Sequence, residues 1–186
     1  MSSSSTSEVP QSEFTLVSAM VAKARGDAEE AVSLAEKVLS MEGNVSNFEA
    51  LVLRGKVSFE RDSGGLADFL RAAKVNPGNP VPFLYLGHAY RARGGGDLGK
   101  ARKCYQKSFH LDPGCTEAAV ALSDVLRDQG AADANAAHLK SVVARSPSAS
   151  DCRWAHVRLG VLYLSRELQD LTNVIWNYRV TMVVRD

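Results

Sequence analysis

Cysteine is scarce in this chain of 186 residues: there are three, an odd number, and none stands in a C-x-x-C pair. This excludes a disulfide framework and indicates reduced thiols inside a cell. Neither sign of charge is in excess, since 22 basic and 21 acidic side chains leave a formal charge of +1. That balance gives no reason to expect a nucleic-acid or membrane-binding surface. No apolar run reaches the length of about 18 residues that a membrane span needs.

Groups of residues that carry catalysis are also missing. The four histidines fall in separate segments at no metal-ligand spacing, and no G-x-S-x-G pattern occurs. The glycines Gly94–Gly96 lack the following GK[ST] of a phosphate-binding loop. Cys104 falls inside a predicted helix beside an aromatic residue, where a core position is favoured over a nucleophile. We therefore expect no enzyme, no cofactor and no metal, and an enzyme is the weakest of three hypotheses.

The most informative stretch runs from Pro80 to Pro113. Apolar residues recur in it at helical spacing on both sides of a glycine-rich turn, which predicts two short helices. Between them, Gly87 is small enough to let a neighbouring helix approach closely. The residue before a proline is pushed out of helical geometry, so Asp112 should end the second helix. The ordered positions Leu86, Gly87, Tyr90, Ala101, Tyr105 and Pro113 are those of a tetratricopeptide repeat.

The same pattern recurs along the chain with a constant register. The glycine-type and proline-type positions are 24 residues apart at Ala19 and Gly43, and again at Ser123 and Pro147. Two further copies differ only in the length of their turns, where insertions need not disturb either helix. The sequence thus predicts an all-α solenoid of helix-turn-helix hairpins that forms a right-handed superhelix.

Three segments follow from this register. Residues 1–11 are serine-rich and predicted to be disordered, and residues 12–164 hold four repeats and the first helix of a fifth. Residues 165–186 form a degenerate tail. The second helix of the fifth repeat should begin within it, near Asp170. The part from Asn173 to Val184 is rich in β-branched and aromatic residues, which favour strand over helix. We interpret the chain as a fragment or variant product with an exposed apolar end, and expect aggregation or partial dimerisation.

First-helix residues that point away from the partner helix should line a concave groove. Their mixed apolar and charged character suits a peptide or a helix of another protein, although each could instead be merely solvated. The Lys and Asn pattern of a carboxylate clamp is absent. The basic run from Lys100 to Lys107 is interpreted as a solvated face, with contact to an acidic partner or RNA as the minor alternative. The candidate groove residues are Val52, Lys56, Phe59, Leu84, His88, Arg91, Val120, Asp124 and Arg127.

Several segments are more specific than the repeat consensus. They are FLRAAKVNP (69–77), YLGHAYRARGGGDLGKARKCYQKSFHLDP (85–113), EAAVALSD (117–124) and RWAHVRLGVLYL (153–164). Together they resemble the tetratricopeptide-repeat scaffold subunits of Ski (superkiller) complexes over roughly residues 66–164. Those subunits carry many more repeats, and residues 171–186 have no counterpart there.

The resemblance implies a non-enzymatic scaffold in the cytoplasm, with the nucleus also possible. Scaffolds of that family hold a DExH-type RNA helicase and WD-repeat subunits together. The assembly feeds RNA to the cytoplasmic exosome for 3′-to-5′ decay, so the exosome would be an indirect partner. No direct contact with nucleic acid or membrane is expected. The alternative is a stand-alone tetratricopeptide-repeat adaptor that binds a linear peptide or helix in its groove.

Overall fold

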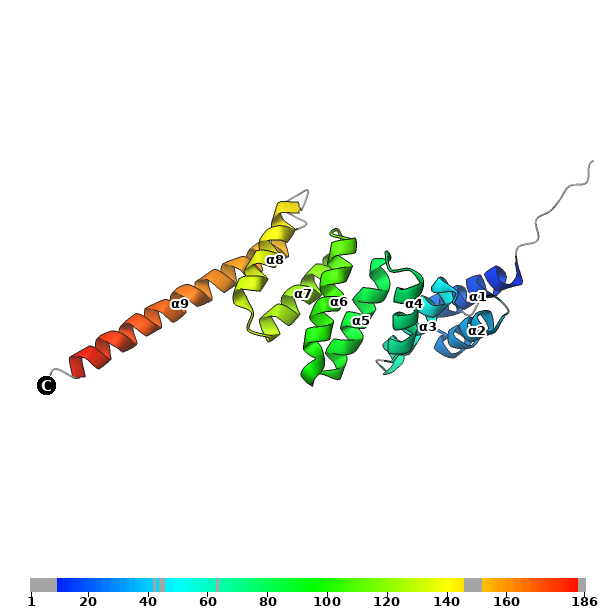
Figure 1. The fold of residues 1–186 in the computed structure, drawn as a ribbon, viewed down its shortest axis with the longest axis horizontal. Coiled ribbons are helices and arrows are strands. Elements are labelled where there is room, and N and C mark those ends of the chain that lie inside the picture. The colour runs from blue at the N-terminus through cyan, green and yellow to red at the C-terminus, as the bar shows by residue number, and fades with distance from the viewer. Residues whose placement is uncertain (1–9, 42, 44–45, 63, 146–151, 184–186) are drawn as a thin grey trace, which may run out of the picture. The chain divides into compact units, whose positions relative to one another are not determined.

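The computed structural model describes residues 10–41, 43, 46–62, 64–145 and 152–183, and within these ranges every regular element is a helix (Figure 1). The expectation of an all-α fold is confirmed. The elements are α1 (Gln11–Arg25), α2 (Ala28–Ser40), α3 (Phe48–Asp62), α4 (Leu66–Val75), α5 (Pro80–Arg93), the short 3-10 helix η1 (Gly95–Asp97), α6 (Leu98–Leu111), α7 (Thr116–Asp128), α8 (Ala132–Arg145) and α9 (Arg153–Val183).

The chain divides into two compact units, residues 1–118 and 119–186, with the boundary inside α7. In the first unit each helix packs against the next along the chain from α1 to α6. The first helices of successive hairpins also touch, because α1 contacts α3 and α3 contacts α5. This second set of contacts is what stacks the hairpins and brings their first helices side by side.

Local sequence explains where the helices of the first unit begin and end. Gly26 adopts a positive φ of 85° at the end of α1, a conformation that costs glycine little. Asp27 then caps α2, since its side chain accepts a hydrogen bond from the backbone N–H of Glu30 at 3.1 Å. At the start of α5, Asn79 accepts from the backbone N–H of Val81 at 2.9 Å. These local signals set the end of α1 and the starts of α2 and α5.

Close helix packing within two hairpins depends on a glycine in the first helix. A Cβ atom on Gly87 would overlap the ring of Tyr105, and one on Gly55 would lie 2.8 Å from Cε1 of Phe69. Both rings are fully buried, so neither can withdraw without losing its contacts. Glycine at this repeat position therefore lets α6 approach α5, as predicted for Gly87, and it also lets α4 approach α3.

The other repeat positions take the places their chemistry favours. Leu86 and Ala101 are buried, Tyr90 is half-buried, and Pro113 is exposed just beyond the last residue of α6. Earlier in the chain, a cluster of buried residues joins three consecutive helices, α2, α3 and α4. Its members are Val38, Leu39, Ala50, Leu51 and Ala72. Small and branched side chains alternate here, which keeps the helices close.

The second unit is held by polar contacts as well as by apolar ones. Nε2 of His138 on α8 donates to the carbonyl oxygen of Ala119 on α7 at 2.8 Å. The guanidinium of Arg166 on α9 lies 2.9 Å from the carboxylate of Asp133 on α8. Burial lowers the pKa of His138, so its imidazole is neutral at pH 7 and one ring nitrogen carries the donated proton.

The predicted strand character of the tail is wrong. Residues 173–183 continue α9, which Figure 1 shows as one unbroken helix. The expected turn and second helix near Asp170 do not form, because the segment SRELQD (165–170) lacks the glycine that ends the first helices α1 and α5. Without a breaker, good helix formers such as Glu, Leu and Gln carry the helix forward, and the β propensity of the following residues is overridden.

Two further expectations concern residues that lie partly or wholly outside the described ranges. Residues 1–9 of the predicted polar N-terminus and the proline-type residue Pro147 lie outside them, whereas Gln11 is the first residue of α1. None of the described helices, α9 included, combines the length and the hydropathy that a membrane span requires.

Candidate functional site

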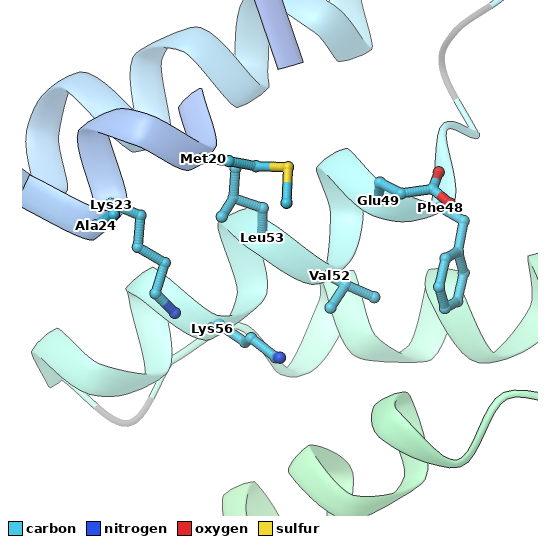
Figure 2. A pocket seen from close by; sticks show the side chains of 8 residues that line it. All are labelled: Met20, Lys23, Ala24, Phe48, Glu49, Val52, Leu53 and Lys56. Carbon is cyan, nitrogen blue, oxygen red and sulfur yellow. The ribbon is translucent and has the colours of Figure 1, made fainter. Parts of the chain in front are cut away.

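A pocket of about 460 Å³ opens between α1 and α3 in the first unit (Figure 2). Side chains at one-turn spacing on each helix form it, and Figure 2 shows those of Met20 and Lys23 extending from α1 toward α3. The lining is Met20, Lys23, Ala24, Phe48, Glu49, Val52, Leu53 and Lys56. Apolar stems make up most of this surface, with two ammonium groups and one carboxylate around them.

The two lysines of the pocket have different surroundings. Nζ of Lys23 lies 2.9 Å from a carboxylate oxygen of Glu60, an exposed ion pair of modest strength. The ammonium of Lys56 lies 5.0 Å from the centre of the Tyr85 ring, which is cation–π geometry. Burial lowers the pKa of Lys56, and the positive charge of Lys23 lowers it further. A carboxylate brought to Lys56 by a partner would stabilise the charged ammonium and offset the penalty of its burial.

An aromatic cluster continues the surface from Lys56 toward α5. The ring of Phe59 lies 6.0 Å from those of Tyr85 and His88, and Tyr85 and His88 are themselves 5.9 Å apart. Beneath them, Phe69 stacks on Tyr85 at 5.1 Å. Edge-to-face and stacked pairs of this kind hold rings in fixed orientations. The cluster is therefore a firm platform beside the pocket.

Hydrogen bonds fix the orientation of the His88 ring. Its Nε2–H donates to the carboxylate of Glu117 at 3.2 Å, and its Nδ1 accepts from the hydroxyl of Tyr105 at 2.9 Å. One neutral tautomer satisfies both bonds, with the proton on Nε2. Burial lowers the pKa of His88 in spite of the opposing effect of Glu117, which agrees with a neutral ring.

The structure brings four of the sequence-predicted groove residues together here: Val52, Lys56, Phe59 and His88. Arg91, also in the first unit, is half-buried on α5. Leu84 is placed differently, because it is 6% exposed and offers no surface to a ligand. We call the pocket lining together with Phe59, Tyr85 and His88 the groove surface.

The three remaining predicted residues lie in the second unit. Asp124 on α7 is 3.2 Å from the guanidinium of Arg127 and 3.0 Å from that of Arg158 on α9. Arg158 also donates to the carbonyl oxygen of Val120 at 3.3 Å and lies over the ring of Trp154 at 5.3 Å. Asp124 and the carbonyl oxygen of Val120 are thus linked to Arg158 on α9, whereas the ion pair of Arg127 with Asp124 lies within α7.

Sequence reasoning missed Met20 and Lys23 as lining residues, although a signal was present. The register that selects Lys56 and Phe59 in the second copy selects Met20 and Lys23 in the first. Tyr85 was missed for a different reason. It stands one position before Leu86, and only the structure shows its ring turned to the cluster. Across the described ranges, His, Cys, Asp and Glu side chains nowhere gather in a set of three or more that could hold a metal ion.

Comparison with known proteins supports the repeat assignment. The tetratricopeptide repeat family matches residues 86–150. Tetratricopeptide repeat protein 37 of Xenopus laevis is 39% identical over 111 residues, which cover 57% of this chain and 7% of that protein. Superkiller complex protein 3 of Homo sapiens is 40% identical over 102 residues, 53% of this chain and 6% of that protein. The chain thus spans less than a tenth of the length of these relatives.

Solved structures share the fold at low sequence identity. A MamA crystal structure is 17% identical, with a TM-score of 0.70, and the match covers 86% of this chain and 84% of that one. The first tetratricopeptide-repeat domain of Spaghetti (RPAP3) bound to an HSP90 peptide is 18% identical, with a TM-score of 0.59, covering 64% of this chain and 94% of that one. Solenoids of this kind generally act as non-catalytic binding scaffolds. The chain therefore has an all-α solenoid fold, matches the tetratricopeptide repeat family over residues 86–150, and is similar over about half its length to superkiller complex protein 3.

Proposed function

We propose that this chain is a scaffold that holds a protein partner on the groove surface. The observation that carries the proposal is the apolar pocket between α1 and α3, which opens directly beside a fixed aromatic platform. Lys56 connects the two, because it lines the pocket and lies over Tyr85. Such a surface suits an amphipathic helix or an extended segment with an apolar anchor and a neighbouring carboxylate.

The assembly that we propose for this scaffold is an RNA-decay complex of the Ski type. Identity of about 40% to superkiller complex protein 3 over half the chain supports it. By that resemblance, the partners are a DExH RNA helicase and WD-repeat subunits, with the exosome as an indirect partner in the cytoplasm. The chain covers 6% of that relative, so we propose that it supplies one part of such an interface.

Affinity capture with the full chain tests this proposal. Two substitutions would disable the groove surface: Lys56→Glu reverses a charge, and Val52→Asp places a carboxylate in the pocket. Val52 also packs against the buried cluster of α2, α3 and α4, so circular dichroism checks that this variant keeps the wild-type helix content. A matched control is Lys74→Glu, on the exposed face of α4. We expect the wild-type and control chains to retain the helicase and the WD-repeat subunits, and both groove variants to lose them. Equal capture by all four chains, or no helicase with the wild type, would overturn the proposal.

A second candidate function is a stand-alone adaptor for a linear peptide. The size of the pocket favours it, because about 460 Å³ suffices for one or two side chains of a short segment. The repeat domain of RPAP3 has been solved with such a peptide, which shows what the fold permits. Capture of a protein through an isolated acidic-apolar peptide, with no helicase present, would favour this candidate over the first.

A further inference from the structure

A second pocket, of about 360 Å³, lies in the second unit between α9 and the helices α7 and α8. Most of its surface is apolar, and a pocket of this size accommodates one side chain together with the backbone around it. We call it the α7–α9 pocket. Its lining includes Ser123 and Arg127 from α7, Asn135 from α8, and Val157, Arg158 and Val161 from α9.

The α7–α9 pocket occupies the same place in the repeat as the pocket between α1 and α3. Counted from the glycine-type position of each first helix, Val157 corresponds to Val52, and Val161 corresponds to Lys56. Both pockets therefore lie between first helices of consecutive repeats, the surface with which solenoids of this kind bind their ligands. Their chemistry differs, because a valine stands in the α7–α9 pocket where the first pocket has an ammonium group.

The α7–α9 pocket contains an amide at a position where the other copies have a small residue. Twelve residues before the proline-type position, the first three copies hold Ala31, Gly65 and Ala101. The fourth copy holds Asn135 there. Ala31 and Ala101 are fully buried, and a Cβ on Gly65 would overlap the backbone of Gly55. A methyl group or less fills this helix contact in the other copies, so packing alone does not require an amide.

The amide of Asn135 is buried with its oxygen unpaired. The residue is 5% exposed, and Oδ1 has no hydrogen-bond partner among the described residues. An unpaired buried acceptor destabilises a fold, so it is rare in native proteins and calls for an explanation. Because Asn135 lines the pocket and the χ2 torsion of asparagine is broad, its oxygen can turn toward a donor that a ligand brings.

The charged groups around the α7–α9 pocket are already balanced. Asp124 lies 3.2 Å from the guanidinium of Arg127 and 3.0 Å from that of Arg158. Asp128 lies 3.5 Å from the guanidinium of Arg127. Two carboxylates thus face two guanidiniums, and a charged ligand group would either break one of these pairs or be buried without a partner. The missing donor should therefore come from a neutral group.

Among neutral groups, a carboxamide matches Asn135 best. Each carboxamide presents an oxygen acceptor and an NH₂ donor in one plane, so two of them can form two hydrogen bonds with each other. A hydroxyl offers a single donor and does not complement both ends of the amide at once. The apolar walls at Val157 and Val161 suit the methylene groups that carry a carboxamide in a side chain.

We propose that the α7–α9 pocket binds an asparagine or glutamine side chain from an extended segment of a protein partner. The NH₂ group of that side chain donates to Oδ1 of Asn135, and its oxygen accepts from Nδ2. This proposal rests on the scaffold function proposed above and adds an anchoring point of different chemistry. The pocket between α1 and α3 accepts a carboxylate at Lys56, whereas the α7–α9 pocket selects a neutral amide.

Selection of short random-sequence peptides on the immobilised full chain tests the proposal. We expect the wild type to enrich peptides with asparagine or glutamine at one fixed position, and Asn135→Ala to lose this enrichment. Two copies of the repeat have a buried alanine at the same position, so the variant should fold. The matched control is Gln106→Ala, which removes an exposed carboxamide from α6. Lys56→Glu alters the other pocket alone and should keep the enrichment.

A double-mutant cycle with one selected peptide shows whether the two amides meet. Asn135→Ala, or alanine in place of the peptide's carboxamide residue, should each weaken binding at least about 10-fold, and both changes together no further. Peptides that lack a fixed carboxamide, or full additivity of the two losses, would overturn the proposal. Loss of binding with Lys56→Glu but not with Asn135→Ala would also overturn it, while leaving the scaffold function of the groove surface intact.

Unfolding in urea gives an independent readout. Asn135→Ala should raise the midpoint more than Gln106→Ala does, because it removes a buried unpaired acceptor as well as improving helix propensity. A lower midpoint for Asn135→Ala would mean that the amide supports the fold, and would overturn a binding role. Binding of a mixed-sequence single-stranded RNA in place of the peptides, with the same sensitivity to Asn135→Ala, would overturn the assignment of a protein partner.

Discussion

Adding a single methyl group at one repeat position should have opposite effects in two copies of the repeat. Gly87 in α5 and Gly160 in α9 occupy the same register position. A Cβ on Gly87 would overlap the Tyr105 ring, whereas a Cβ on Gly160 would meet nothing within 4 Å. The cause is the continuation of α9 as one helix, which leaves Gly160 without the second helix that packs on Gly87.

The magnitudes follow from two opposing effects. Alanine in place of glycine within a helix stabilises by about 1 kcal/mol. Overpacking a well-filled core costs about 1–3 kcal/mol, and the upper end applies at Gly87 because Tyr105 is fully buried and its hydroxyl is bonded to His88. We therefore expect Gly87→Ala to destabilise the chain by about 2 kcal/mol and Gly160→Ala to stabilise it by about 0.5–1 kcal/mol.

Urea unfolding followed by circular dichroism at the helix band measures both effects as shifts of the midpoint. Gly55→Ala provides a second comparison, because its Cβ would lie 2.8 Å from the buried ring of Phe69. We expect it to destabilise in the same direction as Gly87→Ala. The reasoning is refuted if Gly160→Ala destabilises as much as Gly87→Ala, since α9 would then have a packed partner at that position.

Three further predictions concern protonation and a buried ion pair. Burial lowers the pKa of His88 and of His138, so the unfolded chain binds protons first as the pH falls. Stability should be complete above about pH 6.5 and decline below it, and a urea midpoint that is unchanged between pH 7.5 and 5.5 would contradict this. Burial raises the pKa of Cys104 to about 11. This can be measured in a variant whose other two cysteines are replaced by serine. At pH 8, Cys104 should react with a thiol reagent at least about 100-fold more slowly in the folded chain than in the unfolded chain. Equal rates in the two states would show that the fold does not protect this thiol. Asp68→Asn removes the carboxylate that binds Arg54 through two hydrogen bonds, one of them at 2.9 Å from Nε. Thermal unfolding should show a loss of about 2 kcal/mol, and a loss below about 0.5 kcal/mol would mean that solvent replaces the pair.

Much of the fold was predictable because its determinants are local. Gly26 and Asn79 mark helix boundaries through their own conformation and hydrogen bonds, which depend on residues only a few positions away. The small residue at Gly87 was predictable as well, since a repeat fixes which helix will pack on it. The tail was not. In the tail, no glycine or proline ends the helix, and this outweighs the β propensity of the residues that follow. A prediction from single-residue propensities does not take the lack of a helix-ending residue into account.

The candidate site was predictable only in part. Register predicts that Val52 and Lys56 share one face of α3, because side-chain direction on a helix follows from position, and both line the pocket. It did not reveal that Leu84 is covered or that Tyr85 turns toward Lys56. Both depend on how far neighbouring hairpins overlap, and this is set by packing between helices that are distant in sequence.

The most direct measurement of the central claim is site-specific photocrosslinking on the groove surface. A photoreactive residue at Val52 faces the pocket between α1 and α3, and one at Lys74 lies on the exposed face of α4 as a matched control. If the groove surface holds the partner, Val52 forms a covalent adduct with the helicase or WD-repeat subunit that is captured with the chain, and Lys74 does not. Adducts from Lys74 alone, or from both positions in equal yield, would contradict the account.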